Sequence, residues 1–368
     1  MGIDPAGRSC AFIVPGDWNA LTGGYAYDRR IACALEHRGW TVERVSLDGA
    51  FPFPDAAALA HADAACGALT DATLAIVDGL AFGAMPQVAL RHAARLRWVA
   101  LVHHPLWLET GLPTTTQAAL REGEQRALAV ARRVIVTSKH TARDVAAMDV
   151  PTARIVVVEP GTERAPLEEP PECGEPPGKH PQGEDPVGPS LLCVATLTPR
   201  KGHLVLIEAL SGLLDRRWTL HCVGSDLRDP AASAAIRDAL RRHRMEGRVR
   251  LHGEVDDAML RRFYGRADAF VLASHHEGYG MAYAEALARG LPVVGTRAGA
   301  TADTVPPDAG VLVPPADAPA LRAALARLLD DHGWRASLTR GARRARLRLP
   351  DWETAGDAFA AALTGACA

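Results

Sequence analysis

Several features that mark particular classes of protein are scarce or missing in this sequence. Its 368 residues carry 41 basic and 43 acidic side chains, and the net charge of −2 argues against a nucleic-acid binder held by bulk charge. No apolar run approaches the ~20 residues that a membrane span needs, so no membrane-spanning segment is expected. The first ten residues, MGIDPAGRSC, lack a charged stretch followed by an apolar one, so no signal peptide is expected either.

Cysteine is sparse and scattered. The seven cysteines form no CxxC or CxxH pair, which argues against a zinc site and against a disulfide scaffold. Aspartate and histidine show no metal-ligand spacing, so no metal ion is expected. A long chain with scattered cysteines is typical of a reduced, cytoplasmic protein.

Lysine is the scarcest charged residue. It occurs only at Lys139, Lys179 and Lys201, and all the other basic residues are arginine. The simplest interpretation of that bias is a GC-rich genome. The apolar fraction, 48%, is ordinary for a chain that buries a core, and the length suggests two domains or one large one.

Short apolar runs alternate with longer segments of helical period along most of the chain. This alternation predicts an α/β protein with mainly parallel sheets covered by helices on both faces. Strands are expected at Ser9–Val14, Thr41–Leu47, Thr73–Val77, Arg97–Val102, Val134–Thr137, Arg154–Val158, Leu191–Ala195, Trp218–Val223, Val249–Leu251, Ala269–Leu272 and Pro292–Gly295. Helices are expected at Gly24–His37, Lys201–Leu214, Ala231–Arg242, Asp256–Gly265, Met281–Arg289, Ala316–Asp330, Trp334–Arg346 and Trp352–Leu363.

One stretch interrupts the alternation. Residues 159–189 are dense in Pro, Gly and Glu and nearly lack large apolar side chains, so they cannot offset the entropy cost of ordering and are expected to form a linker. We therefore predict a domain over 1–160, a linker over 161–189, a second domain over 190–349 and a last helix within 350–368. Two doubly wound domains would bind ligands beyond the carboxyl ends of their strands.

The segment Ala273–Val294, ASHHEGYGMAYAEALARGLPVV, carries the strongest signal. Gly278 and Gly280 allow a ligand to approach the backbone, and the start of a helix near Met281 offers unpaired N–H groups to a phosphate. Glu277 lies in the loop and Glu285 eight positions later in the helix. Sugar and ribose hydroxyls are natural hydrogen-bond donors to such carboxylates.

This segment resembles the E-x7-E signature of retaining glycosyltransferases of the GT-B fold, in particular glycosyltransferase family 4. The wider run, E-G-aromatic-G followed by E-A-x-A-x-G-x-P-V-V, matches as well, with Tyr279 where Phe is more usual. The resemblance implies two Rossmann-like domains facing a central cleft. It also implies that Glu277 contacts the transferred sugar, that Glu285 binds the nucleotide ribose, and that the amides between Gly278 and Met281 hold the diphosphate.

A second segment, Cys193–Leu210, predicts a strand, a turn and a helix with Lys201 in its first turn. An ammonium and a guanidinium beside a helix start would neutralise a diphosphate. The segment resembles the family's G-R-L-x-x-x-K-G motif, and Lys201 aligns with its Lys. Thr196 occupies the position of the family's Arg, so Arg200 is the candidate for the second cation.

Four further residues follow strands in loops that the resemblance assigns to the donor. Gly224 and His252 lie in loops that line the nucleotide in the family, and His252 is a candidate for stacking on the base as well as a plain loop residue. Gly23 and Gly24 precede the first helix, where paired glycines permit close backbone approach to an anionic or sugar ligand. A tight strand–helix turn would need the same glycines.

A histidine is also expected at the active site. The run Leu101–Leu106, LVHHPL, ends a strand, and family 4 enzymes place a His there close to the donor sugar. We align His103 with that position and keep His104 as second choice. Asp78 and Gly79 end another strand and are candidates for the acceptor side or for a turn.

Two polar segments have simpler explanations beside the functional ones. Ser138 and Thr141 match a family helix start but equally a helix cap. The Arg-rich stretch 335–348 is interpreted as a solvated helix face, with a weak peripheral contact to anionic lipid as the alternative.

The resemblance thus implies a hexosyltransferase that uses a nucleotide-diphosphate sugar as donor substrate, needs no cofactor and retains the anomeric configuration. A UDP-sugar is favoured and GDP-mannose is the other candidate; the acceptor is a small molecule, a glycan or a lipid-linked sugar. Three alternatives stay open: a phosphorylase on the same fold, an inverting or epimerising relative, and a sugar-nucleotide-binding regulatory protein without turnover.

Overall fold

The computed structural model describes residues 8–164 and 188–367, and these divide into two compact units. Unit 1 comprises the chain up to Gly161 together with Pro350–Ala368, and unit 2 comprises Thr162–Leu349. Each unit is described by itself. Most of the expected linker, residues 165–187, lies outside the described residues.

Unit 1 is a six-stranded parallel sheet in the order β2-β1-β3-β4-β5-β6. The strands are β1 (Ser9–Pro15), β2 (Thr41–Leu47), β3 (Leu74–Asp78), β4 (Arg97–Val102), β5 (Arg133–Val136) and β6 (Ile155–Val157). The helices are α1 (Gly23–His37), α2 (Ala56–Ala68), α3 (Gly79–Phe82), α4 (Pro86–His92), α5 (Thr114–Ala129), α6 (Lys139–Ala146) and α14 (Trp352–Cys367).

Unit 2 is a second six-stranded parallel sheet, in the order β12-β11-β10-β7-β8-β9. Its strands are β7 (Ser190–Val194), β8 (Thr219–Val223), β9 (Val249–Leu251), β10 (Ala269–Leu272), β11 (Val293–Thr296) and β12 (Gly310–Val313). Its helices are α7 (His203–Ser211), α8 (Pro230–Arg242), α9 (Asp257–Arg266), α10 (Met281–Ala288), α11 (Thr301–Thr304), α12 (Ala318–Asp330) and α13 (His332–Ala345).

The central strands are buried on both faces, as expected for parallel sheets covered by helices. In unit 1, β3 is buried along its whole length, and Trp98 on β4 packs against Phe82 on α3. In unit 2, β8 and β10 are fully buried, and Phe270 on β10 packs against Tyr283 on α10. The prediction of a doubly wound α/β fold is confirmed, while β12 is a strand that the sequence reasoning did not expect.

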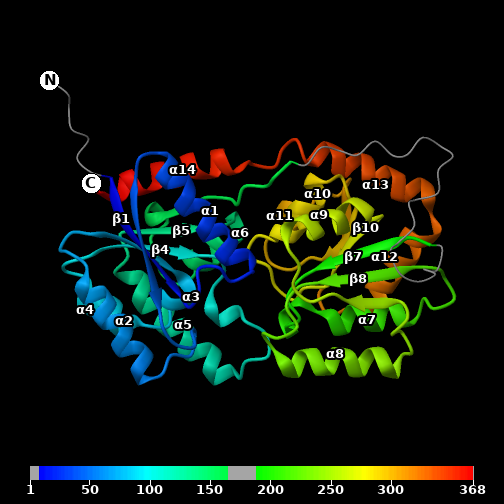
Figure 1. The fold of residues 1–368 in the computed structure, drawn as a ribbon, viewed down its shortest axis with the longest axis horizontal. Coiled ribbons are helices and arrows are strands. Elements are labelled where there is room, and N and C mark those ends of the chain that lie inside the picture. Colours follow the sequence, from blue (N-terminus) through cyan, green and yellow to red (C-terminus); the bar gives the residue numbers. More distant parts are fainter. Residues whose placement is uncertain (1–7, 165–187, 368) are drawn as a thin grey trace. The chain divides into compact units, whose positions relative to one another are not determined.

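The last helix completes unit 1 rather than unit 2. Figure 1 shows α14, in red, alongside α1, in blue. Phe359 on α14 is fully buried, and Arg38 at the end of α1 donates to Asp357 Oδ1 (2.7 Å) and to the carbonyl of Glu353 (2.8 Å). A segment after unit 2 in the sequence therefore forms part of the unit 1 core.

Candidate functional site

The predicted site residues lie at the carboxyl ends of the central strands of each sheet. The strand order reverses between β1 and β3 in unit 1 and between β7 and β10 in unit 2. Ligands of doubly wound sheets bind outside the carboxyl ends of the strands at such a reversal. In unit 1, Gly24 lies at the start of α1, Asp78 is the last residue of β3, and His103 directly follows β4. In unit 2, Lys201 lies in the turn after β7, and Glu277 lies in the loop after β10.

In unit 2 the Glu277 cluster consists of Arg200, Lys201, Ser274 and Glu277. Glu277 Oε1 accepts hydrogen bonds from Lys201 Nζ (2.7 Å) and Ser274 Oγ (2.5 Å). Arg200 Nη1 lies 3.8 Å from Glu277 Oε2 and donates to the carbonyl of His276 (2.9 Å). Two cations therefore meet one buried carboxylate where the β7 and β10 loops come together.

The charge of Glu277 is set by its neighbours rather than by its burial. Burial alone would raise the pKa of this carboxyl, but the charges of Lys201 and Arg200 and the two hydrogen bonds outweigh it and lower the pKa to about 2. Glu277 is therefore ionised at neutral pH. It can accept hydrogen bonds from sugar hydroxyls but cannot donate a proton.

The turn that carries Lys201 differs from the expected one. The sequence predicted a helix from Lys201, but Pro199–Lys201 forms a separate 3-10 turn, Gly202 is left-handed (φ 67°), and α7 begins at His203. The turn packs tightly on the β10 loop: the His275 N–H donates to the Arg200 carbonyl (2.7 Å), and a Cβ on Gly202 would lie 1.9 Å from the Ala273 carbonyl oxygen. Only glycine fits this close approach, which places Lys201 beside Glu277.

The loop from Gly278 to Met281 leads into α10 as predicted. Gly280 has φ 88° and precedes the first helical residue, Met281. Tyr279 is buried, and its carbonyl accepts a hydrogen bond from Thr304 Oγ1 (2.7 Å). The backbone amides of Gly278 to Met281 therefore lie next to the Glu277 cluster, between Glu277 and the first turn of α10.

Glu285 lies on α10 and is held by its surroundings. Its Oε2 accepts a hydrogen bond from Tyr264 Oη (2.9 Å), and the Arg289 guanidinium packs over the Tyr264 ring (4.3 Å). Burial raises the pKa of Glu285, although Arg289 and Tyr264 oppose the rise. An oriented carboxylate of this kind suits a diol such as a ribose.

Gly224 and His252 lie at the ends of β8 and β9. Gly224 has φ 144°, and a Cβ there would lie 2.3 Å from the carbonyl oxygen of Ala195. His252 is half-buried; its ring stacks on His221, with 2.9 Å between His252 Nε2 and His221 Nδ1. Burial, assisted by Arg250, lowers the pKa of His252, so this ring is neutral at neutral pH. Base stacking by His252 stays a prediction.

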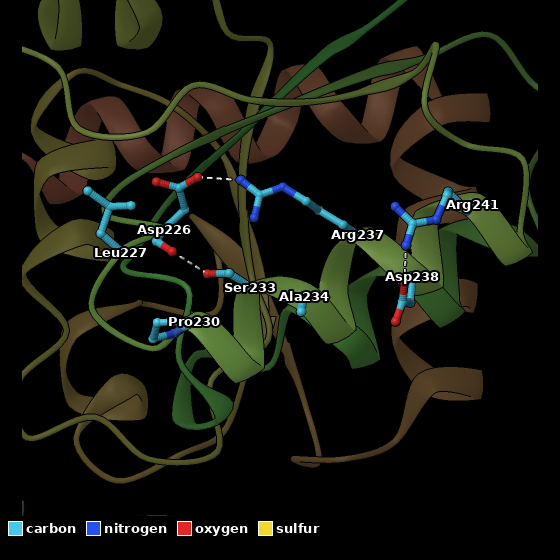
Figure 2. A pocket seen from close by; sticks show the side chains of 8 residues that line it. All are labelled: Asp226, Leu227, Pro230, Ser233, Ala234, Arg237, Asp238 and Arg241. Carbon is cyan, nitrogen blue, oxygen red and sulfur yellow. Dashed lines mark hydrogen bonds and ion pairs between the residues drawn. The ribbon is translucent and has the colours of Figure 1, made fainter.

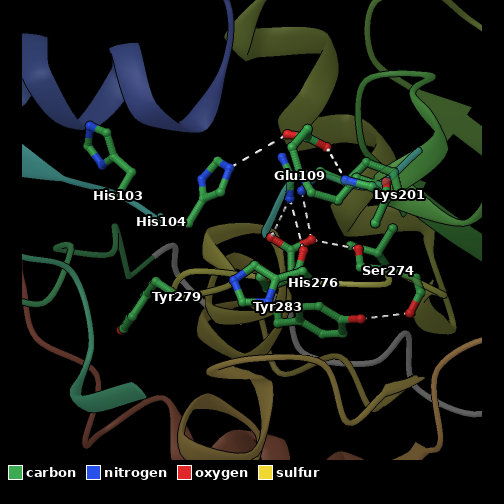
Figure 3. Close-up of polar contacts among 12 residues, drawn as sticks. His103, His104, Glu109, Lys201, Ser274, His276, Tyr279 and Tyr283 are labelled. Atoms are coloured by element: carbon green, nitrogen blue, oxygen red, sulfur yellow. Dashed lines mark hydrogen bonds and ion pairs between the residues drawn. The ribbon is translucent and has the colours of Figure 1, made fainter. Parts of the chain in front are cut away.

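In unit 1 the His103 cluster consists of Gly24, Asp28, Asp78 and His103. His103 Nε2 lies 3.0 Å from Asp28 Oδ1 and 3.4 Å from Asp78 Oδ2, and Gly24 packs against the imidazole ring. His104, by contrast, pairs with Glu109 Oε2 at 3.6 Å (Figure 3). Sequence reasoning did not identify Asp28; its spacing of four from Gly24 on one helix was the available signal.

Other predicted residues have ordinary structural roles. Ser138 caps α6, because its side chain accepts a hydrogen bond from the Thr141 N–H (3.0 Å). This is the second of the two roles predicted for Ser138, that of a helix cap. Asp78 ends β3 and caps α3 through the Leu80 N–H (2.6 Å). Gly23 is the first residue of α1, and Thr196 follows β7. No described helix has both the length and the apolar character of a membrane span.

Two side-chain groups in the described ranges have ligand atoms within 4.8 Å of one another, as a metal site would require: Cys193, His203 and Cys222, and Asp28, Asp78 and His103. In both groups the contacts are those of hydrogen-bonded side chains; for example, Cys193 Sγ lies 3.7 Å from His203 Nε2. The absence of a metal requirement stays a prediction.

A hollow of about 340 Å³ lies along α8, away from the Glu277 cluster (Figure 2). Both of its arginines are paired with carboxylates, Arg237 with Asp226 and Arg241 with Asp238. None of the predicted site residues lines it. The hollow is therefore a weaker candidate for an anion site than the loops at the strand ends.

Comparisons with known proteins agree with this geometry. Residues 188–331 match the family model described as glycosyl transferases group 1, and residues 73–165 match the model described as glycosyltransferase family 4. A glycogen synthase of Mycobacterium tuberculosis is 39% identical over 127 residues (33% of this chain, 30% of the relative). A D-inositol 3-phosphate glycosyltransferase of Kineococcus radiotolerans is 30% identical over 242 residues (61% of this chain, 55% of the relative).

Solved structures match along nearly the whole chain. Sucrose-phosphate synthase from Thermosynechococcus elongatus aligns with a TM-score of 0.77 at 22% identity, covering 96% of this chain and 98% of that one. The Anabaena protein HepE in complex with UDP and glucose aligns with a TM-score of 0.72 at 18% identity, covering 96% and 99%. At these identities the matches show the fold, and they confirm the predicted GT-B architecture.

The curated relatives are longer than the segments that align with them: the chain matches between about a third and about half of their length. The two family models nevertheless cover different units, and they include β3 to β6 in unit 1 and β7 to β12 in unit 2. Each unit therefore matches a glycosyltransferase family model, of group 1 in unit 2 and of family 4 in unit 1, and the E-x7-E run lies where the strand order of unit 2 reverses.

Proposed function

We propose that the protein is a retaining hexosyltransferase that moves a sugar from a nucleotide-diphosphate donor, a UDP-sugar being favoured over GDP-mannose, to an acceptor hydroxyl. The observation that carries this proposal is the convergence of Lys201 and Arg200 on Glu277 next to the start of α10. Two cations and the start of a helix supply the positive field that a diphosphate needs.

The proposed roles follow from the charges of these groups. Glu277, ionised and buried, accepts hydrogen bonds from hydroxyls of the transferred sugar. Lys201, which Glu277 binds in the structure, turns to the diphosphate when the donor occupies the loop, and Arg200 supplies the cation that the family motif places at the position of Thr196. Glu285 binds the ribose, and the amides from Gly278 to Met281 bind phosphate oxygens.

The chemical step is a substitution at the anomeric carbon. The bond from that carbon to the phosphate oxygen breaks, a bond to the acceptor oxygen forms on the same face, and the acceptor proton passes to the departing diphosphate. Negative charge develops on the leaving group, where Lys201 and the α10 amides stabilise it in place of a metal ion. Water is the competing acceptor, so slow donor hydrolysis is expected as a side reaction.

A thermal-shift panel tests the donor assignment. The protein is heated with UDP-, GDP-, ADP- and TDP-sugars in turn, and a ligand at 100 times its dissociation constant adds about 2.7 kcal/mol to the free energy of unfolding. One nucleotide, expected to be UDP, should raise the melting temperature of wild type and raise that of Glu285→Ala much less. No shift with any of the four would contradict the proposal.

Product analysis separates the proposed reaction from the phosphorylase. If adding inorganic phosphate as the only acceptor releases a sugar phosphate, the chain is a phosphorylase; if it changes nothing and an alcohol acceptor is glycosylated, the transferase proposal stands. The anomeric configuration of the glycoside, read by NMR, distinguishes retention from inversion.

A further inference from the structure

The His103 ring in unit 1 is enclosed by buried acids. Its Nε2 lies 3.0 Å from Asp28 Oδ1 and 3.4 Å from Asp78 Oδ2, and the two aspartates are 0% and 4% exposed. Buried carboxylates are costly unless a cation or a hydrogen-bond donor compensates them. The charged groups that act on Asp28 are His103, which opposes the effect of burial, and the second acid Asp78, so His103 is the group that compensates the burial of Asp28.

One face of α1 is shaped to hold the ring. Gly24, Tyr27 and Asp28 lie at successive positions of that face, because residues three and four apart in a helix are neighbours. A Cβ on Gly24 would lie 3.4 Å from His103 Cδ2, Tyr27 meets the imidazole edge-on with the ring centres 5.3 Å apart, and Asp28 binds Nε2. The backbone is fixed as well, since Thr137 Oγ1 donates to the His103 carbonyl (3.1 Å).

The other ring nitrogen is left for a ligand. The His103 side chain is 20% exposed, and within residues 8–164 and 188–367 no hydrogen bond engages its Nδ1. The two aspartates therefore bind Nε2, and Nδ1 is the ring nitrogen that can contact a ligand.

We propose that Asp28 is a positioning residue of the transfer reaction: with Asp78 it binds His103 Nε2, keeps the ring protonated and in one orientation, and leaves the Nδ1–H as a donor to a hydroxyl of the transferred sugar or the acceptor. The effect on sugar transfer rests on the proposed function, whereas the contacts of Asp28 and Asp78 with His103 do not. His103 then acts as a fixed cationic donor and not as a base, because the departing diphosphate takes the acceptor proton.

The electrostatics of the cluster agree with that assignment. Burial alone would lower the pKa of His103, but the two aspartates outweigh it and raise the pKa to about 10. Burial raises the pKa of Asp28 to about 7. Burial would raise the pKa of Asp78 as well, but the hydrogen bonds from His103 and from the Leu80 N–H outweigh it and lower that pKa. The titratable groups that face the ring are Asp28 and Tyr27 from α1 and Asp78 from β3.

Nitrogen-15 NMR of the full chain, labelled on histidine, tests the positioning directly. His103 is assigned from the signals that disappear in His103→Gln. The expected wild-type result is a ring with both nitrogens protonated at about pH 8, well above the usual histidine pKa of about 6.5. A neutral His103 at that pH, or a ring with an unprotonated Nε2, would overturn the proposal. This arm uses the wild-type protein and needs no substitution at Asp28.

The second arm compares Asp28→Asn with a matched control, Asp63→Asn. Asp63 Oδ1 binds His92 Nε2 at 2.9 Å in the same unit, so the control removes the same charge from another buried histidine. Asp28→Asn should lower the titration midpoint of His103 by about 1–3 pH units, and Asp63→Asn should leave it unchanged. An unchanged His103 midpoint in a folded Asp28→Asn protein contradicts the proposal.

Kinetics distinguish a failure of this inference from a failure of the proposed function. With the donor that the thermal-shift panel identifies, Asp28→Asn should lower kcat by roughly 10- to 100-fold with little change in the donor KM, and Asp63→Asn should change neither. A shifted midpoint with an unchanged kcat shows that Asp28 holds the ring but has no part in transfer, which overturns the positioning role. Absence of turnover in wild type would contradict the proposed function. The NMR experiment would then still test whether Asp28 and Asp78 bind His103 Nε2.

Discussion

At the scale of single residues, two histidines that are neighbours in sequence have different environments. His103 is bound by two buried aspartates, whereas His104 pairs with the more exposed Glu109 at 3.6 Å. The alignment with the family favoured His103, and the contacts give it the fixed orientation that an active-site donor needs. Which of the two acts in transfer is decided by substitution.

We expect His103→Ala to lower the rate of sugar transfer much more than His104→Ala does. The physical reason is that truncation at His103 removes an oriented N–H donor and leaves Asp28 and Asp78 buried without a cation, while His104 can be lost from a half-exposed pair at little cost. Initial rates of the two variants with the same donor are the measurement. A larger loss in His104→Ala would mean that the alignment is off by one.

Glu277 makes a prediction about acid stability. A carboxyl whose folded pKa is lowered from 4.5 to about 2 binds protons less readily when folded, so it contributes stability above about pH 4.5. That contribution disappears as the pH falls toward about 2. The difference in Tm between wild type and Glu277→Gln should therefore be largest above about pH 5 and should shrink steadily below it. A difference independent of pH over this range would contradict the ion pair with Lys201.

At the scale of secondary structure, strands and the α10 loop were predictable, whereas the turn before α7 was not. Strand β4 occupies the predicted residues, and α10 begins at Met281 as expected. Local pattern suffices there because β4 is a short apolar run and because Gly278 and Gly280 mark the loop before α10. The helix expected from Lys201 fails because Gly202 adopts a left-handed conformation in close contact with the β10 loop, a partner about 70 residues away that periodicity does not report.

We expect Gly202→Ala to disable the Glu277 cluster. A left-handed φ costs a residue with a Cβ about 1–2 kcal/mol, and the added methyl would also collide with the Ala273 carbonyl, so the turn must shift and take Lys201 with it. Thermal melting and turnover should both fall. Gly247→Ala is the control, since nothing lies within 4 Å of the position that its added methyl would take; an equal effect of the two substitutions would contradict the argument.

At the scale of the whole molecule, the two parallel sheets could be predicted from alternation, but their strand order and the long-range partners could not. Asp28 illustrates the limit: its helix and its spacing from Gly24 are visible in the sequence, while its partner His103 lies 75 positions later. The same holds for Arg38 and Asp357, 319 positions apart, which join α1 to the last helix. Chain topology brings these pairs together, and only the folded arrangement reveals them.

The last helix should be an integral part of unit 1. Phe359 on α14 is fully buried beside Tyr27, so Phe359→Ala should cost about 3–5 kcal/mol. Hydrogen exchange of the full chain should show lost protection in β4 and β5, which α14 covers, and none in β7 to β12. Thr354→Ala, on the exposed side of α14, is the control. A loss of protection confined to unit 2 would contradict the assignment of this helix.

The central claim is that the chain turns over a nucleotide-diphosphate sugar at the Glu277 cluster. The most direct test measures nucleoside diphosphate released from UDP-, GDP-, ADP- and TDP-sugars by wild type, Lys201→Ala, Glu277→Gln and the surface control Arg216→Ala. Wild type and the control should hydrolyse one donor slowly at equal rates, and each cluster variant should be slower by at least ~100-fold, as for loss of a main transition-state contact. Release from no donor, or equal rates in all four proteins, would contradict the account.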